Sequence, residues 1–184
     1  MQYIAITGHR PAKLDYDYEL SGPLCIMIRE RIHEFIEREF VKGNVTFITG
    51  MALGIDTLFA RMAITLGIPF IAAIPCHGHD SKWPERSKSI YRYILSHPLC
   101  TVQLVSDTPY SDAVMQKRNE WMVDRCNHLI AVWDGTSGGT KNCLDYAKKQ
   151  ISAVGNSRVS KIKGIYYIDP NILRKQLQTK PYNS

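Results

Sequence analysis

Apolar and polar positions along the chain follow two patterns, short continuous apolar runs and longer stretches with helical spacing. The short runs predict strands at residues 3–7, 45–49, 68–75, 100–105, 129–133 and 162–168. The run at 3–7 is almost continuously apolar, which is typical of a central strand buried on both faces. The longer stretches carry apolar residues three and four positions apart and predict helices at 20–40, 55–66, 85–96, 111–126 and 140–150. Strands that alternate with helices form βαβ units. We therefore predict an α/β fold, doubly wound, with a mainly parallel sheet of about six strands and helices on both faces.

Three of the predicted strands end in turns that contain glycine. These turns are Thr7-Gly8-His9-Arg10, the stretch from Gly50 to Asp56, and the stretch from Asp134 to Thr140. In an open α/β sheet the loops at the carboxyl ends of central strands meet at one crevice. Backbone N–H groups at the start of the following helices, helped by the helix dipole, suit a phosphate there. Neither G-x-G-x-x-G nor G-x-x-x-x-G-K-[ST] is present, so the prediction of a nucleotide-type ligand depends on the convergence of the three turns.

Several polar side chains near these turns are candidates for ligand contacts. Arg10 is placed to fork onto a phosphate or carboxylate. Asp56 lies in the first turn of a predicted helix, where it either complements the dipole or accepts from ligand hydroxyls such as those of a ribose. Trp83 either stacks on a base or packs its loop against the core. The full set of candidate binding residues is Thr7, Gly8, His9, Arg10, Gly50, Met51, Ala52, Gly54, Asp56, Trp83, Arg118, Asn119, Asp134, Gly138, Gly139 and Thr140.

Composition bounds the class of protein. With 184 residues, 45% of them hydrophobic, the chain can bury one good core and is expected to form one domain. The formal net charge of +6 favours an anionic partner such as a nucleotide or a nucleic-acid backbone. The five cysteines lack C-x-x-C spacing and several lie in apolar runs, which favours a reducing cytoplasm.

Other classes of site and location are not expected. The cluster Cys76-His77-Gly78-His79-Asp80 lacks the second ligand pair that a zinc site requires, so we predict a polar loop and no metal site. No cofactor is required by these patterns. The N-terminus shows no signal peptide, and no window approaches the apolar length of a membrane span. A homo-oligomer is the default expectation for a small domain of this kind.

The ordered set of motifs resembles the YpsA-like family of the SLOG superfamily, which also contains DprA and the LOG phosphoribohydrolases. The resemblance rests on residues 7–11, 50–56, 118–119, 122–124 and 134–140, together with the segment around Trp83. It implies a Rossmann-like fold, a single nucleotide-binding domain over residues 1–170, and a C-terminal helix or tail over 171–184. It also implies a pocket for a nucleotide or a nucleotide-derived ligand such as an ADP-ribose-like molecule.

The resemblance leaves enzymatic activity open. The LOG signature places a catalytic glutamate just after Gly-Thr, whereas here Lys141, Asn142 and Cys143 follow Thr140. We therefore expect binding, by sensing or sequestering the ligand, rather than phosphoribohydrolase turnover. One alternative is an N-glycosidase that uses another carboxylate, namely Asp56, Asp124 or Asp134. A second alternative is single-stranded nucleic-acid binding, because the stretch from Gly50 to Asp56 resembles a DprA segment.

Overall fold

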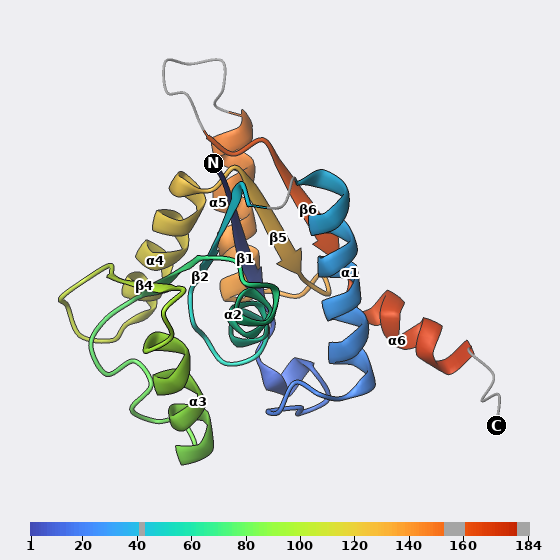
Figure 1. Ribbon diagram of the computed structural model, residues 1–184, viewed down its shortest axis with the longest axis horizontal. Helices are drawn as coiled ribbons and strands as arrows, with labels where there is room; N and C mark the ends of the chain where they lie inside the picture. The colour runs from blue at the N-terminus through green and yellow to red at the C-terminus, as the bar shows by residue number, and fades with distance from the viewer. Residues whose placement is uncertain (41–42, 153–160, 180–184) are drawn as a thin grey trace.

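The computed structural model describes residues 1–40, 43–152 and 161–179 and shows an α/β sandwich of three layers (Figure 1). The strands are β1 (Gln2–Gly8), β2 (Val45–Thr49), β3 (Phe70–Ile74), β4 (Cys100–Leu104), β5 (His128–Val132) and β6 (Gly164–Ile168). The helices are α1 (Pro23–Glu39), α2 (Ile55–Leu66), α3 (Glu85–Leu95), α4 (Asp112–Arg125), α5 (Gly139–Ser152) and α6 (Pro170–Thr179). A short 3-10 helix, η1 (Pro11–Lys13), begins the segment after β1.

The six strands form one sheet in the order β4-β3-β2-β1-β5-β6, and every neighbouring pair is parallel. This arrangement confirms the predicted α/β fold and its parallel, doubly wound sheet. The chain builds outward from β1 to β4 and then returns to place β5 on the other side of β1. The reversal creates a switch point between β1 and β5, where the loops that follow these two strands diverge to opposite faces of the sheet.

The two faces of the sheet have separate hydrophobic cores, because successive side chains along a strand point in opposite directions. In β1, Ile4 and Ile6 pack into the core covered by α1, α2, α3 and α6, and Ala5 packs into the core covered by α4 and α5. All three side chains are fully buried. Their burial explains why β1 is a near-continuous apolar run and lies at the centre of the sheet.

The edges of the sheet depart from the fully buried pattern. The middle of β4 is exposed, and in β6 Ile168 is buried whereas Tyr167 is exposed. Figure 1 shows β4 and α3 at one end of the molecule and β6, α1 and α6 at the other. The predicted C-terminal segment begins as α6, whose Leu173 is buried in the core, and residues 180–184 lie outside the described ranges. None of the helices in the described ranges is long and apolar enough to cross a membrane.

Candidate functional site

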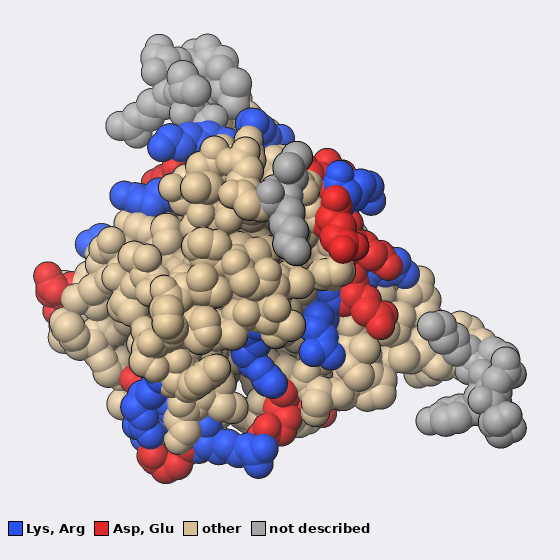
Figure 2. Space-filling view, in the orientation of Figure 1, with Lys and Arg blue, Asp and Glu red and all other residues tan. Residues whose placement is uncertain are grey.

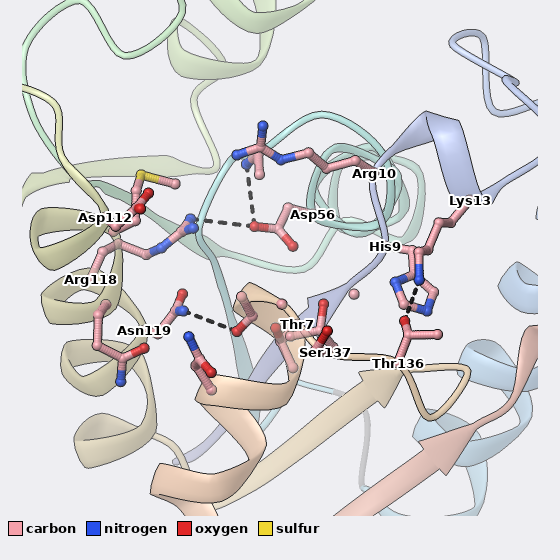
Figure 3. A pocket seen from close by; sticks show the side chains of 18 of the residues that line it. Thr7, His9, Arg10, Lys13, Asp56, Asp112, Arg118, Asn119, Thr136 and Ser137 are labelled. Atoms are coloured by element: carbon pink, nitrogen blue, oxygen red, sulfur yellow. Dashed lines mark hydrogen bonds and ion pairs between the residues drawn. The ribbon is translucent and has the colours of Figure 1, made fainter.

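A cavity of about 590 Å³ opens at the switch point, where the loops after β1, β2 and β5 meet the start of α4 (Figure 3). The prediction that the three glycine-bearing turns share one cavity is therefore met by the geometry. The residues that line the cavity are Thr7, Gly8, His9, Arg10, Ala12, Lys13, Ala52, Asp56, Tyr110, Asp112, Met115, Gln116, Arg118, Asn119, Thr136, Ser137, Gly138, Gly139, Thr140 and Asn142.

The first two turns are joined through their backbones. The N–H of Ile55, the first residue of α2, donates to the carbonyl of His9 at 3.1 Å. Gly54 makes this contact possible, because its φ is +94° and a Cβ atom there would lie 2.3 Å from the His9 oxygen. A residue with a side chain would both strain the backbone and overlap that carbonyl. This hydrogen bond also removes one α2 amide from those available to a ligand.

A buried ion pair closes one wall of the cavity. Arg118, only 5% exposed, donates from Nη1 to the carbonyl of Gly50 and lies 3.4 Å from Oδ2 of Asp56. The amide of Ala52 donates to the same carboxylate oxygen at 3.2 Å. Burial raises the pKa of Asp56, opposed by Arg118 and by the Ala52 hydrogen bond. Nε of Arg118 is buried without a hydrogen-bond partner, so this side chain retains an unused donor at the cavity wall.

The Asp56 carboxylate thus has protein partners of its own. It occupies the first turn of α2, where a negative charge complements the helix dipole. Its oxygen Oδ2 serves both Ala52 and Arg118. Of the two roles considered for Asp56, the structural one is realised in these contacts, and the ribose-binding role stays a prediction.

On the opposite side of the cavity, the loops after β1 and β5 are tied together by a polar network (Figure 3). Nε2 of His9 lies 3.0 Å from the backbone N of Asp134 and 2.9 Å from its Oδ1. The ring accepts from the amide when Nε2 carries no proton and donates to the carboxylate when it does. Nζ of Lys13 donates to Oδ2 of Asp134 at 3.2 Å and also to Oγ1 of Thr136. The backbone N–H and the hydroxyl of Thr136 both donate to Oδ1 of Asp134.

These contacts set the charge states of the network. Burial lowers the pKa of His9, opposed by the carboxylate of Asp134. Burial acts to raise the pKa of Asp134, but hydrogen bonds from Thr136 and Lys13 outweigh it and hold that pKa well below its usual range. Asp134 is therefore a fixed negative charge that neutralises Lys13 in the absence of a ligand.

The start of α5 faces the cavity without a side chain over it. A Cβ atom on Gly138 or Gly139 would meet no atom within 4 Å, and the first helical bond runs from the N–H of Asn142 to the carbonyl of Gly138. The side-chain amide of Asn119 donates to the carbonyl of Gly139 at 3.4 Å and fixes the turn against α4. The amides at the start of α5 thus remain open to an anion, as expected for a helix N-terminus.

Arg10 adds a cation to this open turn. Its side chain is exposed, lines the cavity, and makes no hydrogen bond or ion pair with any other residue of the described ranges. Figure 3 shows it extending over the cavity toward Asp56. The charge of Arg10 acts to lower the pKa of Asp56, but unlike Lys13 and Arg118 its side chain makes no hydrogen bond or ion pair with the rest of the described chain, so its donors are available for an incoming phosphate.

Eleven of the sixteen predicted binding residues line the cavity, namely Thr7, Gly8, His9, Arg10, Ala52, Asp56, Arg118, Asn119, Gly138, Gly139 and Thr140. Four other predicted residues lie behind this lining and hold it in place: Gly50, Met51, Gly54 and Asp134. The Gly50 carbonyl accepts from Arg118, and Met51 is fully buried. Gly54 packs against the His9 carbonyl, and the Asp134 carboxylate contacts His9 and Lys13.

Trp83 is the one predicted residue that lies apart from the cavity. Its ring meets His79 and Tyr91 edge to face, with ring centroids 4.9 Å and 5.4 Å away. Of the two roles considered for Trp83, the structure places it in the packing role, against the core on the α3 side of β3. The exposed aromatic residue that lines the cavity is Tyr110 instead.

The His79 cluster supports the second turn from behind. Nε2 of His79 lies 3.4 Å from the Met51 carbonyl, and the Tyr91 hydroxyl lies 3.3 Å from Nδ1. A carbonyl only accepts, so Nε2 carries the proton and Nδ1 accepts from Tyr91. Met51 has a φ of +56°, an uncommon value for a residue with a side chain, and this hydrogen bond helps to hold it. In the described part of the chain, no group of three or more His, Cys, Asp or Glu is placed to hold a metal ion.

Several cavity residues were not among the sequence-based candidates: Lys13, Tyr110, Asp112, Met115, Gln116, Thr136, Ser137 and Asn142. The helical spacing of the sequence could have revealed part of this group. Helix α4 begins at Asp112, and Met115, Gln116 and Asn119 follow it by three, four and seven positions, so all four lie on one helical face. No comparable pattern marks Lys13 or Tyr110.

Comparison with known proteins identifies the family of this chain. The YpsA family model, described as the YspA SLOG family, matches residues 4–169. The chain belongs to this family. The YpsA SLOG chain is 33% identical over 146 residues to the uncharacterized SPbeta prophage-derived protein YoqJ of Bacillus subtilis strain 168, covering 71% of this chain and 85% of YoqJ. It is 23% identical over 159 residues to a UPF0398 protein of Bacillus thuringiensis strain Al Hakam, covering 82% and 84% of the two chains.

Solved structures of DprA share the fold of the YpsA SLOG chain. DprA from Helicobacter pylori, described for its single-stranded DNA binding mode, superposes with a TM-score of 0.54 at 16% identity over 96% of this chain and 80% of that chain. DprA from Streptococcus pneumoniae gives a TM-score of 0.50 at 20% identity over 81% of this chain. The match spans 47% of the Streptococcus protein, so this chain corresponds to about half of it. Identities this low establish a common fold and not a common ligand.

Proposed function

We propose that this YpsA SLOG chain binds a nucleotide or a nucleotide-derived ligand, such as an ADP-ribose-like molecule, in the cavity at the switch point. The observation that carries the proposal is the pairing of the open first turn of α5 with the unpartnered Arg10 over one cavity of about 590 Å³. This volume falls within the range of small-molecule sites. A phosphate held there would receive backbone N–H groups from Gly139 and Thr140 and a charged fork from Arg10.

The unused donor of Arg118 supports the same proposal. Nε of Arg118 is buried and unpartnered in the absence of a ligand, which is unfavourable for a guanidinium. Because Nε has almost no accessible surface, a ligand oxygen in the cavity can pair with this donor only after the Arg118 side chain moves. The Asp134 carboxylate partly neutralises Lys13, so Arg10 and the α5 turn carry most of the attraction for a phosphate.

Binding without turnover fits the carboxylates better than catalysis does. Asp56 is held by Arg118 and Ala52, and Asp134 is held by Lys13 and Thr136. Asp124 accepts from the hydroxyl of Tyr146 at 2.9 Å and does not line the cavity. Each of the three carboxylates considered for an N-glycosidase thus has protein partners, and of the three only Asp56 lines the cavity.

Isothermal titration calorimetry with ADP-ribose, AMP and NAD tests the proposal. We expect saturable binding of at least one of the three, and weaker binding by Arg10→Gln by about 10- to 100-fold, the loss of one hydrogen-bonded charge. Arg31→Gln is the matched control, because Arg31 is an exposed arginine on α1 outside the cavity and should leave affinity unchanged. No binding of any of the three nucleotides, or equal affinity of Arg10→Gln and wild type, would contradict the proposal.

The two alternatives are tested on the same protein. An N-glycosidase would release free base from AMP or ADP-ribose, which chromatography detects. Single-stranded DNA binding would shift a labelled oligonucleotide and weaken steeply with salt. On the face shown in Figure 2, Lys and Arg lie beside Asp and Glu around the periphery and do not form one continuous basic stripe, which favours the small-molecule ligand.

A further inference from the structure

One end of the cavity is formed by a single face of α4. Asp112, Met115, Gln116 and Asn119 follow one another at helical spacing and all line the cavity. Figure 3 shows Asp112 and Asn119 on the side opposite His9 and Thr136. Asn119 lies beside the α5 turn, since its amide donates to the Gly139 carbonyl, and Asp112 lies seven positions earlier on the same face. A ligand whose phosphate lies at Arg10 and the α5 turn can therefore extend along this face toward Asp112.

The orientation of the Gln116 amide is fixed by its neighbour. Nε2 of Gln116 donates to Oε1 of Glu120 at 3.0 Å. An ionised carboxylate only accepts hydrogen bonds, so the nitrogen of the amide must face Glu120 and the oxygen must face away from it. Oε1 of Gln116 is buried and has no donor in the described part of the chain. Its negative partial charge is therefore uncompensated beside the cavity.

A second acceptor at the same end is the carboxylate of Asp112. It is exposed, lines the cavity, and has no hydrogen bond or ion pair within the described ranges. Asp112 lies in the first turn of α4, where a negative charge complements the helix dipole. Tyr110, 54% exposed, adds an aromatic ring to the rim. This end of the cavity thus combines a flat apolar surface with an excess of acceptors.

We infer that the α4 end of the cavity selects a nucleobase that carries an amino group in place of a keto oxygen at purine C6 or pyrimidine C4, namely adenine or cytosine, over the corresponding keto bases hypoxanthine and uracil. The inference rests on the proposed function, because it assigns the base to the Asp112 end of the α4 face, beyond a phosphate held at the α5 turn. The N–H groups of an amino substituent can donate to the Asp112 carboxylate, and their positive partial charges are attracted by the Gln116 side-chain oxygen. A keto oxygen at the same place would face a carboxylate, an unfavourable approach of two acceptors. The Tyr110 ring is placed to stack on either kind of base.

The test compares ligands that differ at this one group. Calorimetric affinities of the full chain are measured for AMP against IMP and for CMP against UMP, at one pH and one salt concentration. We expect the amino form to bind at least about 10-fold more tightly within at least one pair, the effect of one hydrogen bond to a charged group. The pair that shows the preference distinguishes adenine from cytosine.

Two variants locate the preference. Asp112→Asn replaces an acceptor-only group with one that offers both a donor and an acceptor, so the amino-to-keto affinity ratio should fall toward one. Asp107→Asn makes the same change in charge on an exposed carboxylate outside the cavity and should keep the wild-type ratio. Because the wild-type comparison needs no substitution, instability of either variant does not prevent the test.

The outcomes separate this inference from the proposed function. If AMP, IMP, CMP and UMP bind but each amino form matches its keto form, the base assignment is overturned and the phosphate site stands. If ADP-ribose, NAD, ribose 5-phosphate and all four nucleotides fail to bind, the proposed function is overturned and the base assignment falls with it. An Asp112→Asn variant that keeps the full preference would overturn the role given to Asp112.

Discussion

Acidification should destabilise the YpsA SLOG chain through His79. The ring is 7% exposed, and its two nitrogens contact Met51 and Tyr91. Burial, together with the nearby charges of Arg118 and Arg10, lowers the pKa of His79 to about 4, opposed by the Met51 hydrogen bond and by Asp80. An imidazole in the unfolded chain has a pKa of about 6.5.

The sign and size of the effect follow from these two pKa values. The unfolded state takes up the proton first as the pH falls below about 6.5, and the folded state takes it up only near pH 4. The stabilisation due to neutral His79 is therefore present above pH 6.5 and is lost as the pH falls toward 4. At about 1.4 kcal/mol per pH unit of difference in proton binding, lowering the pH from 7.5 to 5 removes about 2 kcal/mol of unfolding free energy.

Urea unfolding at pH 7.5 and pH 5 measures this loss. The free energy of unfolding of wild type should fall more than that of His79→Gln by about 2 kcal/mol, because glutamine does not titrate in this range. His33→Gln, on the exposed surface of α1, is the control and should behave as wild type. Equal pH dependence in wild type and His79→Gln would refute the reasoning, whatever the stability of the variant at pH 7.5.

Three further predictions concern the framework of the site. Gly54→Ala should lower the urea-unfolding free energy by roughly 2–5 kcal/mol, because its φ of +94° and the 2.3 Å approach to the His9 oxygen both penalise a Cβ atom; a loss below 1 kcal/mol would contradict this. Arg118→Met should cost about 3–5 kcal/mol by leaving Asp56 buried without its cation, and adding Asp56→Asn should recover part of it. Burial raises the pKa of Cys143 to about 12, so its thiol should resist disulfide reagents at pH 8 until the protein unfolds; rapid labelling of native protein would show the burial to be wrong.

The fold was predictable because a strand that is buried on both faces of the sheet has an almost continuous run of apolar residues. The run that forms β1 is almost entirely apolar, since Ile4 and Ile6 enter one core and Ala5 enters the other. The predicted strand 100–105 corresponds to β4 (Cys100–Leu104), although three of its residues are exposed at the edge of the sheet. The sequence analysis did not predict η1 (Pro11–Lys13), because a short 3-10 turn has no apolar period to reveal it.

The parts of the site formed by backbone turns could be predicted from the sequence. The parts formed by side chains were harder to predict. Glycine-bearing turns after β1, β2 and β5 meet at one cavity because parallel strands bring their carboxyl ends to one edge of the sheet. Trp83 and Tyr110 show the limit of this reasoning. Both are aromatic residues in loops on the same edge, and only the path of each loop decides that Trp83 packs on His79 while Tyr110 lines the cavity.

The buried partnerships of charged residues were also hidden in the sequence. Arg118 and Asp56 are 62 positions apart, and no local pattern indicates that they pair. The same holds for Lys13 and Asp134, which are 121 positions apart. These pairs decide which charges are free for a ligand, so Arg10 emerges as the available cation only from the folded arrangement.

A crystal structure of the protein soaked with ADP-ribose or AMP tests the central claim most directly. We predict phosphate density within hydrogen-bonding distance of the backbone N–H groups of Gly139 and Thr140, with the guanidinium of Arg10 turned onto it. Density for the nucleotide on another face of the molecule, or a phosphate that avoids the start of α5, would contradict the account.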